Sequence, residues 1–194
     1  QILSLLGGSL LAMLLIALAR FNFLSNGVQS YRSLTDGPLL TSQLIYEANL
    51  HFKVQAQEWQ NVLLRGKQPQ DMEKYWGQFQ DRQRDVQGIL TRLVAQTSSD
   101  PSLSRRIETL RQEHQQLGVA YQKGRDAYVA AGGDATAGDT AVKGVDRAAR
   151  EQMRALVGDL REQGSQQSKA ISAYAERTVL VGLAIMLLSG VLIG

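Results

Sequence analysis

The sequence predicts an all-α protein, an antiparallel up-down-up-down four-helix bundle flanked by two transmembrane helices. Two uncharged apolar runs, Ile2–Ala19 and Thr178–Gly194, stand at the two ends of the chain. Between them, apolar residues recur at alternating steps of three and four, which is the spacing of packed helices. Short turns separate the long helical stretches and make consecutive helices antiparallel. The expected domains are residues 1–19, 20–177 and 178–194.

The two apolar runs are predicted to be membrane anchors. They hold eighteen and seventeen uncharged residues. At the helical rise per residue each spans roughly 26 Å, which is close to the hydrocarbon thickness of a bilayer. A signal peptide cleaved after Ala19 is the alternative for the first run. An uncleaved anchor is preferred because no basic segment precedes the run and a second run follows. The missing initial methionine makes us expect a piece of a longer protein.

The first long helix is predicted to run from Arg20 to about Arg65. Its heptad positions keep one register throughout, and they are Leu24, Gly27, Tyr31, Leu34, Pro38, Thr41, Ile45, Ala48, Phe52, Gln55, Trp59 and Val62. A proline inside a helix costs about 3 kcal/mol. We therefore expect any bend at Pro38, with helix on both sides because the spacing resumes in phase. Gly66 and Pro69 then predict a turn into the next helix.

The second and third helices are predicted over residues 69–96 and 101–131. Asp100 can cap the third helix, whose first residue is Pro101. The expected core positions of the second helix are Met72, Tyr75, Trp76, Phe79, Val86, Ile89, Leu90 and Leu93. Those of the third are Leu103, Ile107, Leu110, His114, Leu117, Tyr121, Gly124, Tyr128 and Ala131.

A flexible loop of small residues is predicted over residues 131–138, with Gly132–Gly138 the most mobile part. Asp139 or Thr140 can cap a fourth helix, which is expected to continue unbroken to the end of the chain. Its expected core positions are Val142, Val145, Ala149, Met153, Leu156, Leu160, Gln163, Gln167, Ala170 and Tyr174.

Several polar residues fall at or beside the predicted core. His51 and His114 are expected at similar heights, where they could bind a metal or sense pH, although structural or solvent-facing histidines are preferred. Gln55, Gln163 and Gln167 occupy heptad core positions. They either set the helix register, mark a layer that can slide, or face a dimer partner.

Basic and aromatic side chains near the far end of the bundle form the candidate ligand site. They are Arg65, Lys74, Arg147, Arg150, Trp59 and Trp76. Arginine can hold an anion with two parallel hydrogen bonds, and aromatic rings can line a pocket. Acidic residues are mixed among the basic ones, and aromatic residues at helical spacing usually belong to a core. A solvated surface and ordinary core packing are therefore the alternatives.

Composition and motifs argue against several function classes. The 21 basic and 18 acidic residues are interspersed, so nucleic acid is not a predicted partner. The chain has no cysteine, which excludes disulfides and thiolate metal sites. It lacks a nucleophile elbow, a phosphate-binding loop and a metal-ligand motif, so we predict no enzyme, no cofactor and no metal site.

Residues 51–66, HFKVQAQEWQNVLLRG, resemble a segment in the sensor regions of bacterial methyl-accepting chemotaxis receptors. The two anchors around a helical domain of this size are similar to the four-helix-bundle class of these receptors. The resemblance implies a receptor module that detects an extracytoplasmic signal. The fourth helix and second transmembrane helix would pass it to a cytoplasmic output that controls a kinase.

The resemblance also implies partners and a location. It implies a homodimer in lipid, in the bacterial inner membrane, with residues 20–177 periplasmic. Its ligand would be a small molecule or a periplasmic binding protein, and its output would act on a cytoplasmic kinase and adaptor. The arginines that hold ligand in such receptors do not align with this sequence, so no ligand residue is transferred. The sensor region of a membrane histidine kinase and a ligand-free helical scaffold are the alternatives.

Overall fold

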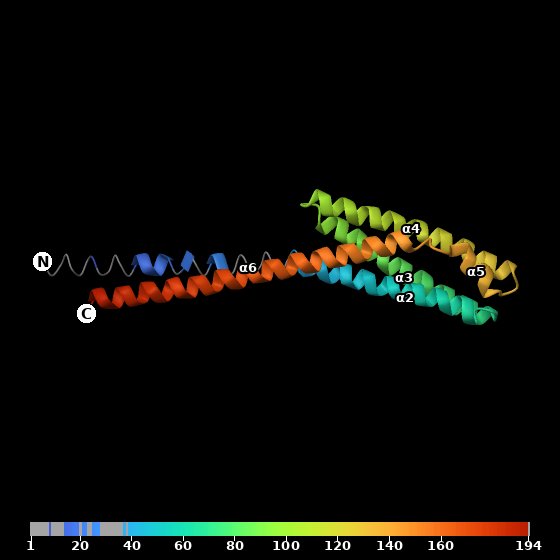
Figure 1. The fold of residues 1–194 in the computed structure, drawn as a ribbon, viewed down its shortest axis with the longest axis horizontal. Helices are drawn as coiled ribbons and strands as arrows, with labels where there is room; N and C mark the ends of the chain where they lie inside the picture. Colours follow the sequence, from blue (N-terminus) through green and yellow to red (C-terminus); the bar gives the residue numbers. More distant parts are fainter. Residues whose placement is uncertain are drawn as a thin grey trace. The chain divides into compact units, whose positions relative to one another are not determined.

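The computed structural model describes residues 8, 14–19, 21–22, 25–27, 37 and 39–193. Its helices are α2 (Leu40–Arg65), α3 (Pro69–Gln96), α4 (Pro101–Ala130), α5 (Ala135–Val142) and α6 (Arg147–Ile193), as Figure 1 shows. No strand occurs in these described ranges, which confirms the predicted all-α class. Contacts divide the chain into two units, one of residues 40–162 and one of residues 1–39 with 163–194.

One hydrophobic core fills the unit of residues 40–162, and α2, α3, α4, α5 and the start of α6 all contribute to it. The buried residues of α2 are Thr41, Leu44, Ile45, Ala48, Phe52, Gln55, Trp59 and Val62, which includes every predicted heptad position from Thr41 onward. Among the α6 residues whose exposure the structure describes, Leu160 is the last buried one. The predicted core positions Gln163, Gln167 and Ala170 are exposed. Helix packing around one core is consistent with the predicted bundle.

The turns between α2, α3 and α4 form as their residues predict. The N–H of Gly66 donates to the carbonyl of Val62 at 2.8 Å, and a Cβ at Gly66 would lie 2.4 Å from that oxygen. Glycine is therefore favoured here because a Cβ would collide with that oxygen, and Gly66 does not adopt the left-handed backbone of Gly132, Gly133 and Gly144. The carboxylate of Asp100 accepts from the N–H groups of Ser102 and Leu103 at 3.1 and 3.0 Å, so it caps α4 as expected.

The predicted loop over 131–138 is wrong in its second half, because α5 begins at Ala135. The turn is made by Gly132 and Gly133, which have φ values of 69° and 87°, and Asp134 caps α5 by accepting from the N–H of Thr136 at 2.9 Å. A Cβ at Gly138 would lie 2.7 Å from Leu63 Cδ2. The small residues thus permit close packing of a helix, where the sequence had predicted flexibility.

The predicted unbroken fourth helix is also wrong. Residues 143–146 separate α5 from α6, and Gly144 in this link has a φ of 77°. That left-handed backbone favours glycine over residues with a Cβ. The expected caps Asp139 and Thr140 lie inside α5. From Arg147, α6 then continues for 47 residues without a further break.

The predicted membrane placement is contradicted. Within the part of the chain that the structure describes, no helix combines the length and the apolar character that a membrane crossing requires. The expected location in the bacterial inner membrane, with residues 20–177 periplasmic, is therefore corrected. The predicted segments 1–19 and 178–194 stay predictions. Most of residues 1–19, and the expected bend at Pro38, lie outside the described residues.

Candidate functional site

The two histidines do not form a common site. His114 is fully buried, with Nε2 at 2.8 Å from Gln55 Oε1 and Nδ1 at 2.8 Å from Gln87 Nε2. Because the Gln87 amide donates to Nδ1, Nε2 must carry the proton that Gln55 accepts. Burial lowers the pKa of His114 to about 4, so this pairing holds a neutral ring. His114 is therefore a structural histidine of the core, as preferred from the sequence.

His51 lies at a partly exposed position with charged neighbours. Its Nδ1 is 3.1 Å from both Arg82 Nη1 and Asp85 Oδ2. Over the described ranges, no group of three or more histidine and carboxylate side chains could hold a metal ion. Neither histidine therefore provides a candidate ligand site.

The two predicted aromatic site residues belong to the core. The Trp59 ring meets Tyr121 edge-on at a centroid distance of 5.1 Å, and Trp76 stacks on Phe79 at 4.9 Å with 8° between the ring planes. Phe79 also lies 5.0 Å from Tyr121. These contacts match the core alternative, and Trp76 in addition borders a cavity at the end of the bundle.

The four predicted basic residues are not brought together in one pocket. Arg65 donates to the Tyr75 hydroxyl at 3.2 Å, and the Lys74 ammonium lies 5.0 Å from the centroid of the same ring. Arg147 pairs with Glu151 at 3.1 Å on the exposed side of α6. Of the four, Arg150 borders a groove described below.

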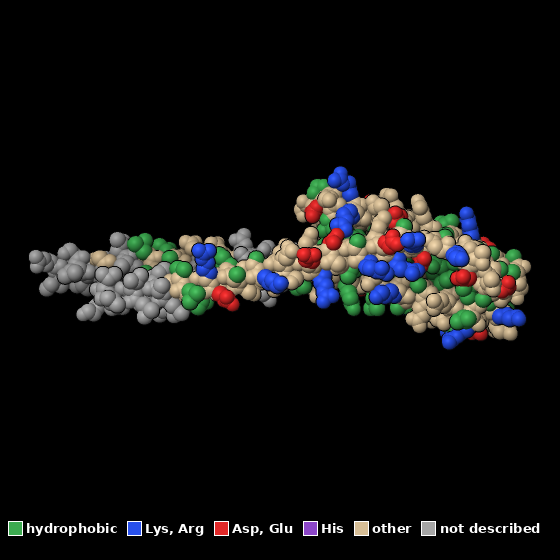
Figure 2. Space-filling model, in the orientation of Figure 1, with side chains coloured by type: hydrophobic (Ala, Val, Ile, Leu, Met, Phe, Trp, Pro, Cys, Tyr) green, Lys and Arg blue, Asp and Glu red, His purple; other side chains and the backbone are tan. Residues whose placement is uncertain are grey.

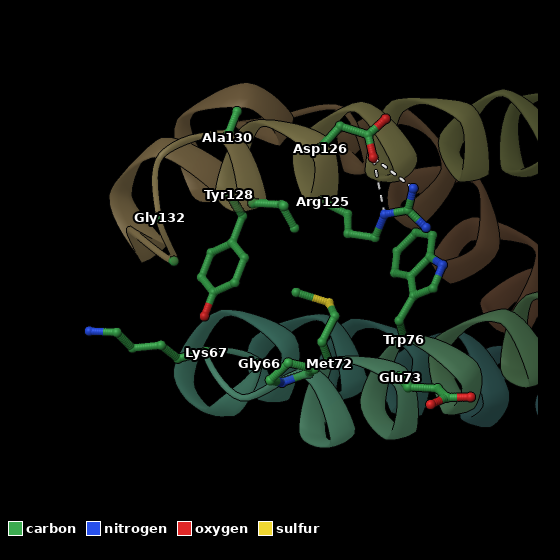
Figure 3. Close-up of a pocket in the computed structure, with 13 residues that line it drawn as sticks. Gly66, Lys67, Met72, Glu73, Trp76, Arg125, Asp126, Tyr128, Ala130 and Gly132 are labelled. Carbon is green, nitrogen blue, oxygen red and sulfur yellow. Dashed lines mark hydrogen bonds and ion pairs between the residues drawn. The ribbon is translucent and has the colours of Figure 1, made fainter.

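The end cavity, shown in Figure 3, lies between the α2–α3 turn, the start of α3 and the end of α4. Its volume is about 820 Å³, and Met72 and Trp76 form part of its wall. The Arg125 guanidinium covers the Trp76 ring at 4.9 Å and is bonded to Asp126 at 2.7 Å. Its charged lining is Lys67 and Arg125 against Glu73 and Asp126, so the cavity favours neither sign of ligand charge.

A second concavity, which we call the α2–α6 groove, has a clear excess of positive charge. Its volume is about 390 Å³, and its lining residues are Asn49, Phe52, Lys53, Ala56, Gln60, Asp146, Arg150, Arg154 and Val157. Three of these are basic and one is acidic. Figure 2 shows Lys and Arg side chains gathered over the start of α6 and the adjoining part of α2.

Helical periodicity places these side chains in two facing rows. Asn49, Lys53, Ala56 and Gln60 follow one another at steps of four, three and four along α2. Asp146, directly before α6, is followed at steps of four, four and three by Arg150, Arg154 and Val157 at the start of α6. Residues three and four apart share one face of a helix. Two helices lying side by side therefore turn both rows into one groove.

The three cations of the groove differ in whether they have an acidic partner. Arg150 forms an ion pair with Asp146, whereas no ion pair of Lys53 or Arg154 occurs among the described residues. Burial raises the pKa of Tyr121, and the positive charge of Arg150 opposes that rise. Amide and cationic donors in one small groove are the chemistry that binds an oxyanion.

Sequence reasoning missed Lys53 and Arg154. Both lie on exposed helix faces, where the apolar pattern carries no information on which neighbour they face. The sequence signal that could have found them is the spacing of polar residues, three and four apart, next to the buried positions of each helix. That signal needs the helix pairing before it identifies a groove.

Comparison with known proteins gives one informative relative. No family model matches the chain, and no solved structure matches it. The chain is 50% identical over 187 residues to the methyl-accepting chemotaxis protein CtpH of Pseudomonas aeruginosa, a match that covers 96% of this chain and 33% of that protein. The chain thus spans about a third of this relative. The similarity confirms the resemblance to methyl-accepting chemotaxis receptors.

Proposed function

We propose that this chain is the sensor module of a chemoreceptor, which binds a small oxyanion in the α2–α6 groove and passes the event along α6. The observation that supports this most is the excess of cations in the groove, with Lys53 and Arg154 lacking an acidic partner among the described ion pairs. Sequence similarity to a methyl-accepting chemotaxis protein favours a chemoreceptor over the two alternatives, the sensor region of a histidine kinase and a ligand-free helical scaffold.

The groove suits an anion of modest size. Guanidinium groups bind carboxylates and other oxyanions through two parallel hydrogen bonds, and the amides of Asn49 and Gln60 can complete the remaining contacts. Ala56, between Lys53 and Gln60, has only a methyl side chain and so leaves space on the α2 side of the groove. A volume of about 390 Å³ admits an inorganic oxyanion or a short organic acid.

The relay in this proposal is α6. It supplies Arg150 and Arg154 to the groove and extends from Arg147 to Ile193, a length of roughly 70 Å. Packed helices switch by shifts of about 1–2 Å, so a ligand that draws Arg150 and Arg154 toward α2 would displace the start of α6. The resemblance implies that the receptor beyond this module then controls a kinase through an adaptor.

Expected loss of anion binding in an Arg154 variant tests the proposal. The 194-residue chain is titrated calorimetrically with sulfate, inorganic phosphate and L-malate, whose responses distinguish inorganic from organic ligands. Arg154→Gln should weaken binding of the responding anion at least about tenfold, because a hydrogen bond to a charged group contributes about 1.5–3 kcal/mol.

Arg92→Gln is the matched control, since it removes the same charge from an exposed position of α3 that is not among the groove residues. Its affinity should equal that of the parent chain. Absence of binding for all three anions, or an equal loss in both variants, would contradict an oxyanion site in this groove.

A homodimer is the second part of the proposal. Tyr46, Leu50 and Leu64 are each more than half exposed on α2, and their steps of four and fourteen place them on one face. Leu50→Glu should shift the dimer toward monomer in sedimentation equilibrium, because a carboxylate would be desolvated at the interface. Val119→Glu, at an equally exposed apolar position on α4, should leave the dimer unchanged. A monomeric parent chain would refute the homodimer.

A further inference from the structure

We infer that Asp146 is a built-in competitor for the ligand of the α2–α6 groove, holding Arg150 until an external anion displaces it. This inference rests on the proposed function and adds to it the regulation of that same site. It concerns how the groove is kept in its ligand-free state.

The two partners of the Asp146–Arg150 ion pair differ in exposure. The Asp146 side chain is only 14% exposed, whereas that of its partner Arg150 is 56% exposed. The carboxylate is therefore sheltered in the groove while the guanidinium retains an open side. A carboxylate is itself an oxyanion, and it occupies donors that an external oxyanion would need. Asp146 thus stands where part of a ligand would stand.

The remaining two cations of the groove have no ion-pair partner among the described residues. Lys53 and Arg154 border the same groove and take part in none of the ion pairs found over the described ranges. An incoming anion can be held by these two cations before Arg150 is released. One internal carboxylate cannot neutralise all three cations, so an external anion retains a binding advantage.

The backbone places Asp146 directly before the first turn of α6. Asp146 is the last residue of the link between α5 and α6, and Gly144 two residues earlier has a φ of 77°. Its side chain therefore sits on a turn and not within a regular helix. Its carbonyl nevertheless accepts from the N–H of Arg150 at 2.9 Å, which joins it to the first turn of α6. Release of the carboxylate consequently acts at the start of the proposed relay helix.

Removal of the competitor should increase affinity. In calorimetric titrations of the 194-residue chain with sulfate, inorganic phosphate and L-malate, Asp146→Asn should bind the responding anion at least roughly two- to fivefold more tightly, since even an exposed ion pair contributes up to about 1 kcal/mol and this pair is partly sheltered. Asparagine keeps the shape of aspartate and is equally suited to the position before a helix. Asp146→Ser should give the same gain, so the result does not depend on one variant folding.

Glu151→Gln is the matched control. It also removes one negative charge and breaks an i,i+4 ion pair of early α6, that of Arg147 with Glu151, but Glu151 does not border the groove. Tighter binding by the Asp146 variants with unchanged binding by Glu151→Gln supports the inference. Unchanged or weaker binding by the Asp146 variants, or an equal gain in Glu151→Gln, overturns it while leaving the oxyanion site intact. A parent chain that binds no anion overturns the proposed function and this inference together.

Discussion

Replacing Phe79 with alanine should lower the free energy of unfolding by about 3–5 kcal/mol, the usual cost of truncating a buried aromatic side chain. Phe79 is fully buried and joins three helices through ring contacts, with Trp76 at 4.9 Å, Tyr121 at 5.0 Å and Trp59 at 6.5 Å between centroids. The cavity would open in the middle of this aromatic layer. Urea denaturation followed by circular dichroism measures the change.

Val119→Ala is the control for this measurement. Val119 is more than half exposed on α4, so its truncation should change the free energy of unfolding by less than about 0.5 kcal/mol. Both variants are compared at one protein concentration, since association contributes to stability. A loss below about 1 kcal/mol for Phe79→Ala would contradict a central role of this layer.

Acidification should destabilise the fold through His114. Burial lowers the pKa of this residue in the folded state to about 4, from 6.5 for the unperturbed side chain. Between these values the unfolded chain binds the proton and the folded chain does not, so stability rises with pH. The contribution is complete above pH 6.5 and is lost as the pH falls toward 4. At about 1.4 kcal/mol per pKa unit the total is roughly 3 kcal/mol.

Denaturation curves between pH 4 and 7 test this expectation. His114→Gln removes the titrating group while retaining hydrogen-bonding capacity toward Gln55 and Gln87, so the slope of stability with pH should become shallower whatever the variant's own stability. Hydrogen bonds from Arg111 lower the pKa of Glu108 to about 2, which places its effect at lower pH. Equal slopes in His114→Gln and the parent chain would contradict the assignment.

The position of His114 also shows how much the sequence could predict. Its place in the core follows from spacing alone, because Leu110, His114 and Leu117 recur at steps of four and three and all three are buried. Its partners Gln55 and Gln87 come from two other helices. Those partners depend on helix rotation and register, which no local pattern specifies.

The residues of the candidate site could likewise be predicted only in part, because helix packing determines which charged side chains share a groove. Arg150 was among the predicted ligand residues and borders the α2–α6 groove, whereas Arg65 and Lys74 meet at the Tyr75 ring instead. A charged residue on a helix surface has the same sequence signature wherever it points. Only the tertiary structure places Lys53 in one groove with Arg150 and Arg154.

By itself the sequence determined the helical class, the turns at Gly66 and Asp100, and the buried faces of α2, α3 and α4. These follow from local spacing and from capping, which act over a few residues. Only the tertiary structure decided that small residues around Gly138 form α5 against Leu63, and that Gly144 separates α5 from α6. Close packing and a left-handed backbone arise from contacts between distant segments, so the residues alone could not distinguish them from a flexible loop.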